Sequence, residues 1–106
     1  MAKYLLEVNY TLEGIKGVKA KGGSARVAAA TALIEGLGGK IESFYFAFGG
    51  TDVYVTADFP DNVSAAAAAF TVCAGGGATA KTVVLLTADE VDAAAAKKTT
   101  YRPPGS

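Results

Sequence analysis

The first residues of the chain alternate between large apolar and mostly polar side chains, which predicts a half-buried strand over residues 3–10. One side of that strand carries Tyr4, Leu6, Val8 and Tyr10. A short helical piece is expected to start at residues 11–14 and to be broken up by the glycines that follow, because glycine weakens helices. The first full helix is then expected to begin with Ser24 as its N-cap and to end at Gly38-Gly39.

The second half of the chain repeats this alternation of strand and helix. Residues 40–48 are rich in aromatic side chains and predict a second strand, which Gly49-Gly50 joins to a third strand over residues 52–59. Asp61 is the predicted cap of a helix that runs to about Ala74 and is ended by three glycines. Residues 79–86 predict a fourth strand. Thr87 and Glu90 then form a predicted capping box for a last helix, which ends near residue 98.

Strand, helix, strand, strand, helix, strand, helix is the order of the split βαβ motif with one helix added. We therefore expect an α+β fold, a ferredoxin-like βαββαβ sandwich with a four-stranded antiparallel sheet and a C-terminal helix. At 106 residues the chain is expected to form one domain, residues 1–106, in which residues 99–106 are an extended tail.

The formal charge is zero, with ten basic and ten acidic residues. A balanced charge offers no basic surface for nucleic acid or for an anionic membrane, so neither is expected as a partner. Residues 63–80 carry no charge, but their alanines and three glycines favour a buried helix and its loop over a membrane span. The start of the chain lacks the long apolar core of a signal peptide, and we therefore expect a cytoplasmic location.

The sequence contains no histidine and one cysteine, which removes many kinds of catalytic site. Ser–His–Asp and Cys–His catalysis, histidine-ligated zinc and histidine-ligated haem are all excluded. One cysteine supplies neither an internal disulfide nor a thiolate-rich metal site, so no metal and no cofactor are expected. Cys73 lies in the alanine-rich helix and is interpreted as a small buried hydrophobic residue, with a reactive thiol as the less favoured alternative.

Several short runs resemble those of the GYD-domain proteins of bacteria and archaea. They are Gly22-Gly23-Ser24-Ala25-Arg26, Phe44-Tyr45-Phe46-Ala47-Phe48-Gly49, Leu85-Leu86-Thr87 with Glu90, and Tyr101-Arg102-Pro103-Pro104-Gly105. The family is named for a Gly-Tyr-Asp run at the hairpin, where this chain has Gly50-Thr51-Asp52 and lacks the tyrosine. The resemblance implies a dimeric α/β-barrel arrangement, in which two ferredoxin-like sheets pack face to face. It implies no particular activity, and the loss of the tyrosine puts any family function that needs it in question.

The residues themselves also favour self-association into a homodimer or a higher oligomer. The helix around residues 65–69 carries no charge on any face, and such a helix is expected to be buried all round. A sheet with helices on one face also leaves the other face bare, and the candidates for that face or its rim are Leu5, Phe44, Phe46 and Tyr54. The tail, with Tyr101 and its diproline, is expected to pack across a neighbouring subunit, unless it is a plain linker. The alternative is that alanine is helix-favouring filler and that the sheet face is mostly polar.

Polar side chains on neighbouring strands form the predicted ligand site, on the open face of the sheet. The candidate residues are Glu7, Asn9, Tyr45, Asp52 and Tyr54. If they share one face, they place carboxylates, an amide and phenols among aromatic side chains, which is typical of a small-ligand pocket. In the alternative interpretation Asp52 caps the hairpin turn and Glu7 pairs with a lysine.

A second candidate is an anion site at the start of the first full helix, formed by Gly23, Ser24 and Arg26. No lysine of a phosphate-binding loop follows, and a flexible helix entry is the alternative. The function expected overall is that of an uncharacterised ligand-binding or assembly module with a pocket on the open sheet face. A cofactor-independent oxygenase or isomerase acting on a small aromatic or enolisable substrate is the alternative, with a carboxylate as base.

Overall fold

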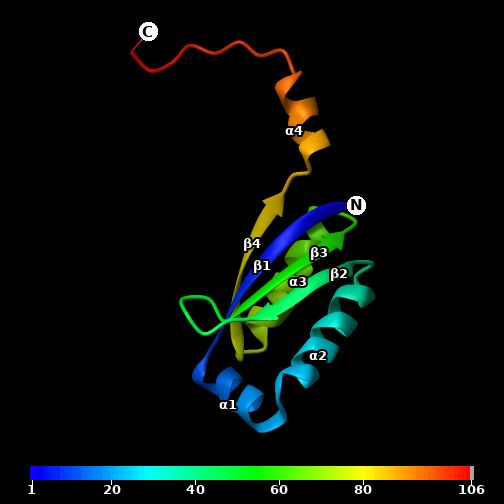
Figure 1. The fold of residues 1–106 in the computed structure, drawn as a ribbon, viewed down its shortest axis with the longest axis vertical. Helices are drawn as coiled ribbons and strands as arrows, with labels where there is room; N and C mark the ends of the chain where they lie inside the picture. The colour runs from blue at the N-terminus through cyan, green and yellow to red at the C-terminus, as the bar shows by residue number, and fades with distance from the viewer. Residues whose placement is uncertain (106) are drawn as a thin grey trace.

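The computed structural model describes residues 1–105 and contains one four-stranded antiparallel sheet with four helices (Figure 1). The strands are β1 (Ala2–Tyr10), β2 (Lys40–Phe46), β3 (Val53–Phe59) and β4 (Ala78–Leu85). The helices are α1 (Leu12–Lys21), α2 (Gly23–Gly36), α3 (Asn62–Ala74) and α4 (Ala88–Ala95). Within the sheet the order is β2-β3-β1-β4, which confirms the predicted ferredoxin-like arrangement. Ser106, the last residue of the predicted tail, lies outside the described residues.

The predicted helix starts were correct for α1, α3 and α4, whereas the predicted cap of α2 and the predicted break-up of α1 at its glycines were wrong. Asp61 caps α3, and Thr87 and Glu90 form the predicted capping box of α4. However, α1 is a helix of ten residues that runs through its two glycines, and Thr11 caps it by accepting a hydrogen bond from the N–H of Gly14. The residue that caps α2 is Gly22, at φ 82°, a conformation that glycine adopts without steric cost. Ser24 therefore lies inside α2 and makes no capping hydrogen bond.

The core lies between the sheet and helices α2 and α3. Its buried residues are Tyr4, Leu6, Ile34, Val53, Val55, Ala57, Phe59, Ala65 and Ala68. Alternation along β3 is regular, with buried residues at every second position from Val53 to Phe59. The register places Phe44 opposite Val55 and Phe46 opposite Val53, so both phenylalanines lie on the helix face. Their expected place on the open face was wrong, because that expectation depended on a register that alternation alone does not fix.

Helix α3 is not buried all round within one chain. Ala65 and Ala68 face the core, whereas Val63 and Phe70 are 79% and 73% exposed on the outer side. Cys73 is exposed too, so its interpretation as a buried residue was wrong. The uncharged sequence of α3 thus leaves an apolar outer surface. Among residues 1–105, no helix combines the length and the apolar character that crossing a membrane requires.

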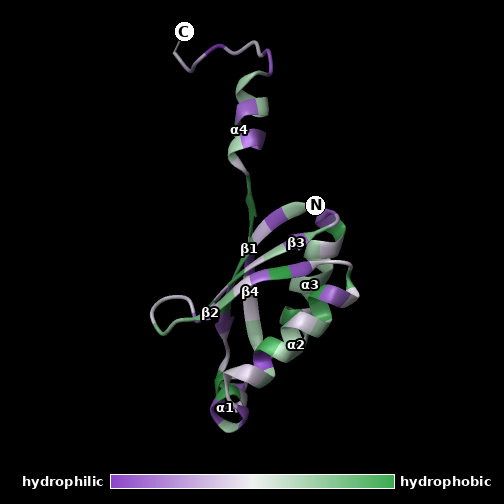
Figure 2. Ribbon diagram, turned by 45° about the vertical axis from the view of Figure 1, so that its right-hand side comes forward, coloured by the Kyte–Doolittle hydropathy of each residue, from purple (hydrophilic) through white to green (hydrophobic). Residues whose placement is uncertain are grey.

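The C-terminal arm, residues 86–105, points away from the rest of the molecule (Figure 1). It comprises α4 and the extended tail, and every one of its residues is exposed. The arm raises the radius of gyration to 16.9 Å, whereas a compact domain of this length is expected to have about 13 Å. The end of β4 is hydrophobic where the strand extends beyond the rest of the sheet toward α4 (Figure 2). Val84 and Leu86 there are 55% and 59% exposed.

Candidate functional site

The open face of the sheet carries a row of side chains that crosses all four strands. Tyr45 pairs with Tyr54, Tyr54 with Glu7, and Glu7 with Lys81. Three of the five predicted site residues are therefore neighbours on one face, because directly paired residues point to the same side of a sheet. Tyr45 is 70% exposed and Tyr54 40% exposed. The row thus lies on the surface of the single chain.

The other two predicted residues, Asn9 and Asp52, hold the backbone at the base of the hairpin. A carboxylate oxygen of Asp52 accepts a hydrogen bond from the backbone N–H of Tyr10 at 2.9 Å. The N–H of Asp52 itself donates to the side-chain oxygen of Asn9 and to the carbonyl of Val8, at 3.1 and 3.0 Å. Both side chains therefore fasten the start of β3 to the end of β1, so the Asp52 carboxylate has a structural role at β1 rather than the expected one of capping the hairpin turn.

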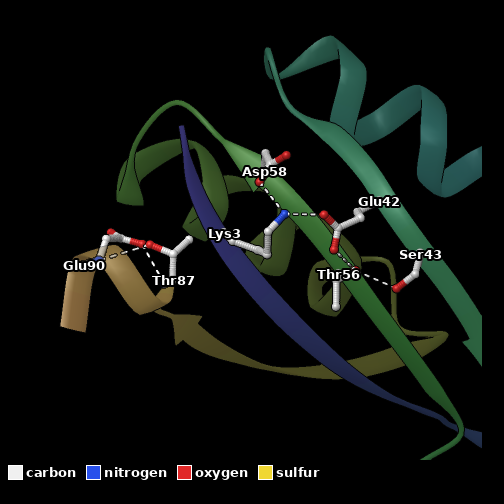
Figure 3. A network of polar contacts seen from close by, with 7 residues as sticks. All are labelled: Lys3, Glu42, Ser43, Thr56, Asp58, Thr87 and Glu90. Carbon is white, nitrogen blue, oxygen red and sulfur yellow. Dashed lines mark hydrogen bonds and ion pairs between the residues drawn. The ribbon is translucent and has the colours of Figure 1, made fainter. Parts of the chain in front are cut away.

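A polar network occupies the other end of the open face, toward the start of β1 (Figure 3). The ammonium of Lys3 contacts Glu42 at 2.6 Å and Asp58 at 2.9 Å. These hydrogen bonds, with Glu42 first and Asp58 second, raise the pKa of Lys3. Glu42 is present beside Ser43 on this face because a register irregularity between Ile41 and Ser43 inserts it into β2. The polar groups in this network bind one another rather than facing an open site.

A cavity of about 70 Å³ lies on the opposite face, between the sheet and helices α2 and α3. Apolar side chains form most of its wall: Leu6, Val8, Ala30, Leu33, Ile34, Phe44, Val53, Val55, Ala68, Val72, Ala78 and Ala80. Four of these are alanines, from α2, α3 and β4. Their small side chains leave space that larger ones would fill, and an empty apolar cavity destabilises a folded protein.

Tyr10 and Arg26 supply the polar groups of this cavity wall. Tyr10 ends β1, and Arg26 lies in the first turn of α2. Burial raises the pKa of the Tyr10 phenol, while the positive charge of Arg26 acts in the opposite direction. The side chain of Arg26 therefore lies close enough to the phenol for their charges to interact.

A wider hollow of about 450 Å³ adjoins the cavity and shares Tyr10, Arg26, Leu33, Val72 and Ala78 with its wall. We call this hollow the vestibule. Its charged residues are Lys21 and Arg26, with Glu13 as the one acidic group in the wall. The cavity and the vestibule are direct neighbours, because five residues line both.

Close packing of α1 against the turn before β4 closes one side of the vestibule. The N–H of Thr11 donates to the carbonyl of Gly77 at 3.0 Å, and its hydroxyl donates to the carbonyl of Gly76 at 2.9 Å. A Cβ atom on Gly14 would lie 1.8 Å from the carbonyl oxygen of Gly77. This approach requires glycine at position 14, which explains why a glycine lies inside helix α1.

The structure does not bring the three residues of the predicted anion site together. A Cβ atom on Gly23 would meet the ring of Phe46 at 3.0 Å, so this glycine serves packing between α2 and β2. Ser24 is exposed in the first turn of α2 and lines neither cavity. Only Arg26, of the three predicted residues, lies at the apolar cavity.

Comparison with protein families links this arrangement to a known domain. The sequence model of the GYD domain matches residues 4–95 of the 106-residue chain. The chain belongs to the GYD-domain family. The matched region holds the whole sheet except the first residues of β1, the residues that line both cavities, and α4. Comparisons with curated proteins and with solved structures find no match.

The departure of this GYD domain from the family's name motif lies away from the cavity. Thr51 is in the loop between β2 and β3, which carries the fully exposed Phe48. Neither residue lines the cavity or the vestibule. The retained Asp52 of the motif binds the backbone N–H of Tyr10, which places a family residue directly behind the polar edge of the cavity.

Sequence reasoning missed Tyr10 as a site residue and grouped it only with the apolar side of β1, because it alternates with Leu6 and Val8. The signal that was present is its position at the last residue of a strand, where a tyrosine can bury its ring and keep its hydroxyl near the surface. The cavity itself has no sequence signal, since it depends on alanines from three separate elements.

Proposed function

We propose that this GYD domain is a homo-oligomeric binding module that holds a small organic ligand in the cavity between the sheet and helices α2 and α3. The observation that carries the proposal is an apolar cavity whose wall includes two adjacent polar groups, Tyr10 and Arg26. Small-molecule sites have this composition, with a mostly apolar lining and a few polar groups that fix orientation. A ligand there would restore the contacts that the alanine-lined space lacks.

This location replaces the open face as the favoured pocket. The row of Tyr45, Tyr54 and Glu7 lies on an exposed surface, and two of the other predicted residues are engaged with the backbone. The enzymatic alternative, a cofactor-independent oxygenase or isomerase, needs a base that faces an enclosed substrate. The apolar cavity has no carboxylate in its wall, so the geometry favours binding over catalysis.

A direct test is a titration of the ¹⁵N-labelled protein with small neutral and charged organic compounds, followed by amide chemical shifts. Saturable shifts at residues of the cavity wall, such as Leu33 and Val72, are expected for at least one compound. No saturable shift with any compound, up to concentrations of several millimolar, would contradict a ligand-binding role.

The C-terminal arm supports the proposal of self-association. An isolated helix of eight residues is unstable in water, even with a complete capping box. In α4, Ala88, Val91 and Ala95 share one side, by their three- and four-residue spacing. Burial of that side against a second copy would stabilise the helix. The exposed apolar end of β4 and the outer side of α3 add further surface for a partner copy.

Light scattering at several protein concentrations tests this second part. We expect the mass of a dimer or a larger assembly at micromolar concentration. The mass of a single chain throughout would leave the arm without a partner and would contradict self-association.

A further inference from the structure

We propose that the ligand is a small organic monocarboxylate, whose apolar body fills the cavity and whose carboxylate binds Arg26 and Tyr10. This inference rests on the proposed function and adds the chemical class of the ligand. Its three supports are the size and apolar lining of the cavity, the two donors at its edge, and the charge of the vestibule.

The cavity suits an apolar group of a few carbon atoms. Its volume of about 70 Å³ is roughly five times the minimum that holds one water molecule. Water gains little in its apolar part, because most of the wall offers no hydrogen-bond partner. A short branched alkyl chain or a single ring, extended partly into the vestibule, fits this space and this lining.

The two polar groups at the edge are both donors. The guanidinium of Arg26 presents a planar fork of N–H groups that matches the two oxygens of a carboxylate. Among residues 1–105, the ion pairs are those of Lys3, so Arg26 has no carboxylate partner in the described chain. The hydroxyl of Tyr10, protonated at neutral pH, provides a further donor beside it.

The charge of the vestibule favours one negative charge on the ligand. Among the residues that line the vestibule, Lys21 and Arg26 are opposed by Glu13, a balance of one positive charge, while the Asp52 carboxylate lies behind Tyr10 and is bound to its backbone N–H. A cationic ligand would meet this charge unfavourably. The two negative charges of a phosphate dianion would exceed the positive charge of the vestibule. A phosphate would also need more hydrogen-bond donors than this wall supplies. A single carboxylate matches both the charge and the planar fork.

The test compares two acids with their neutral amides: isovalerate with isovaleramide, and phenylacetate with phenylacetamide. Dissociation constants are measured by ¹⁵N chemical-shift titration of the full chain. We expect at least one acid to bind about tenfold or more tightly than its amide, since hydrogen bonds to a charged group contribute that much. Arg26→Gln should remove this difference, and Tyr10→Phe should reduce it several-fold. Lys19→Gln removes the same charge from an exposed position that lines neither cavity, and it should change the constants less than twofold.

The outcomes separate this inference from the proposed function. Equal binding of acid and amide at the cavity, unaffected by Arg26→Gln, would overturn the carboxylate assignment and leave the ligand-binding role standing. An equal loss in Arg26→Gln and Lys19→Gln would show general charge attraction and would also overturn it. No binding of any of the four compounds, at concentrations where other compounds shift cavity residues, would overturn the ligand class alone. If nothing binds at all, both proposals fail.

Discussion

The two faces of the sheet use their side chains in different ways. On the open face, polar groups satisfy one another, as in the contacts of Lys3 with Glu42 and Asp58, and large side chains such as Tyr45 lie at the surface. On the helix face, buried apolar residues pack closely except at a cavity lined by alanines, with Arg26 and Tyr10 at its edge. The comparison teaches that a cluster of polar residues is not by itself a binding site. An apolar hollow with a few polar groups at its edge is the more informative feature.

The largest effect is expected from matched aromatic truncations on the two faces. Phe59 is fully buried and packs edge-on against Tyr4, with ring centroids 5.6 Å apart. Phe59→Ala should lower the free energy of unfolding by about 3–5 kcal/mol, because it removes contacts and leaves a cavity. Tyr45→Ala, on the open face, should change it by less than about 0.5 kcal/mol. Urea unfolding followed by circular dichroism measures both values. Similar losses in the two variants would mean that the open face is covered, for example by a second copy.

Two glycines of α1 test how the helix side is closed. In Gly14→Ala the new Cβ atom would overlap the carbonyl oxygen of Gly77, so α1 must move and its hydrogen bonds to residues 76 and 77 weaken. We expect a loss of about 1–3 kcal/mol from such overpacking. Gly17 has open space around its Cβ position, and Gly17→Ala should stabilise the helix by up to about 1 kcal/mol. Thermal unfolding of both variants gives the comparison, and a stabilised Gly14→Ala would contradict the packing described here.

The arm provides a prediction about assembly rather than folding. Val91→Asp places a charge on the apolar side of α4, whereas Ala93→Asp places the same charge on the opposite side, near Asp89. If copies associate through the arm, Val91→Asp should weaken association at least tenfold, and Ala93→Asp should change it little. Sedimentation or light scattering across a concentration series measures this difference. Equal effects of the two variants would remove α4 from the interface.

The smallest effect concerns the cap of α3, which covers the helix face. The N–H of Ser64 donates to the carboxylate of Asp61 at 2.8 Å, and this bond lowers the pKa of Asp61. The bond therefore stabilises the fold above the unfolded-state pKa, and this contribution is lost as the pH falls through the folded-state pKa. Asp61→Asn keeps a capping oxygen without the charge. The free energy of unfolding of this variant should therefore fall less between pH 5 and pH 3 than that of the unchanged protein. Thermal unfolding across that range compares it with the unchanged protein. Asp61→Ala serves as the control that lacks the cap at every pH.

The fold could be predicted from the sequence because each element carries a local signal. Alternation identified β1 and β3, and caps at Asp61 and Thr87 fixed the starts of α3 and α4. The start of α2 was predicted wrongly because Gly22, a glycine at positive φ, caps the helix two residues before Ser24.

The candidate site could be predicted only in part. Alternation correctly grouped Glu7, Tyr45 and Tyr54, since pairing keeps them on one face. It could not show which face carries an apolar hollow, because that depends on side-chain volumes brought together from α2, α3 and β4. Phe44 illustrates the difficulty: its side depends on the register of β2 against β3, which a local pattern does not determine.

The most direct test of the central claim is to locate a bound ligand on one face of the sheet. The ¹⁵N-labelled protein is titrated with phenylacetate, and the amide shifts are compared between cavity residues Leu33, Val72 and Ala80 and the open-face residues Glu7 and Tyr54. Saturable shifts at the cavity residues, lost in Arg26→Gln, are the predicted result. Saturable shifts centred on Glu7 and Tyr54 would contradict the account and place the site on the open face of the sheet.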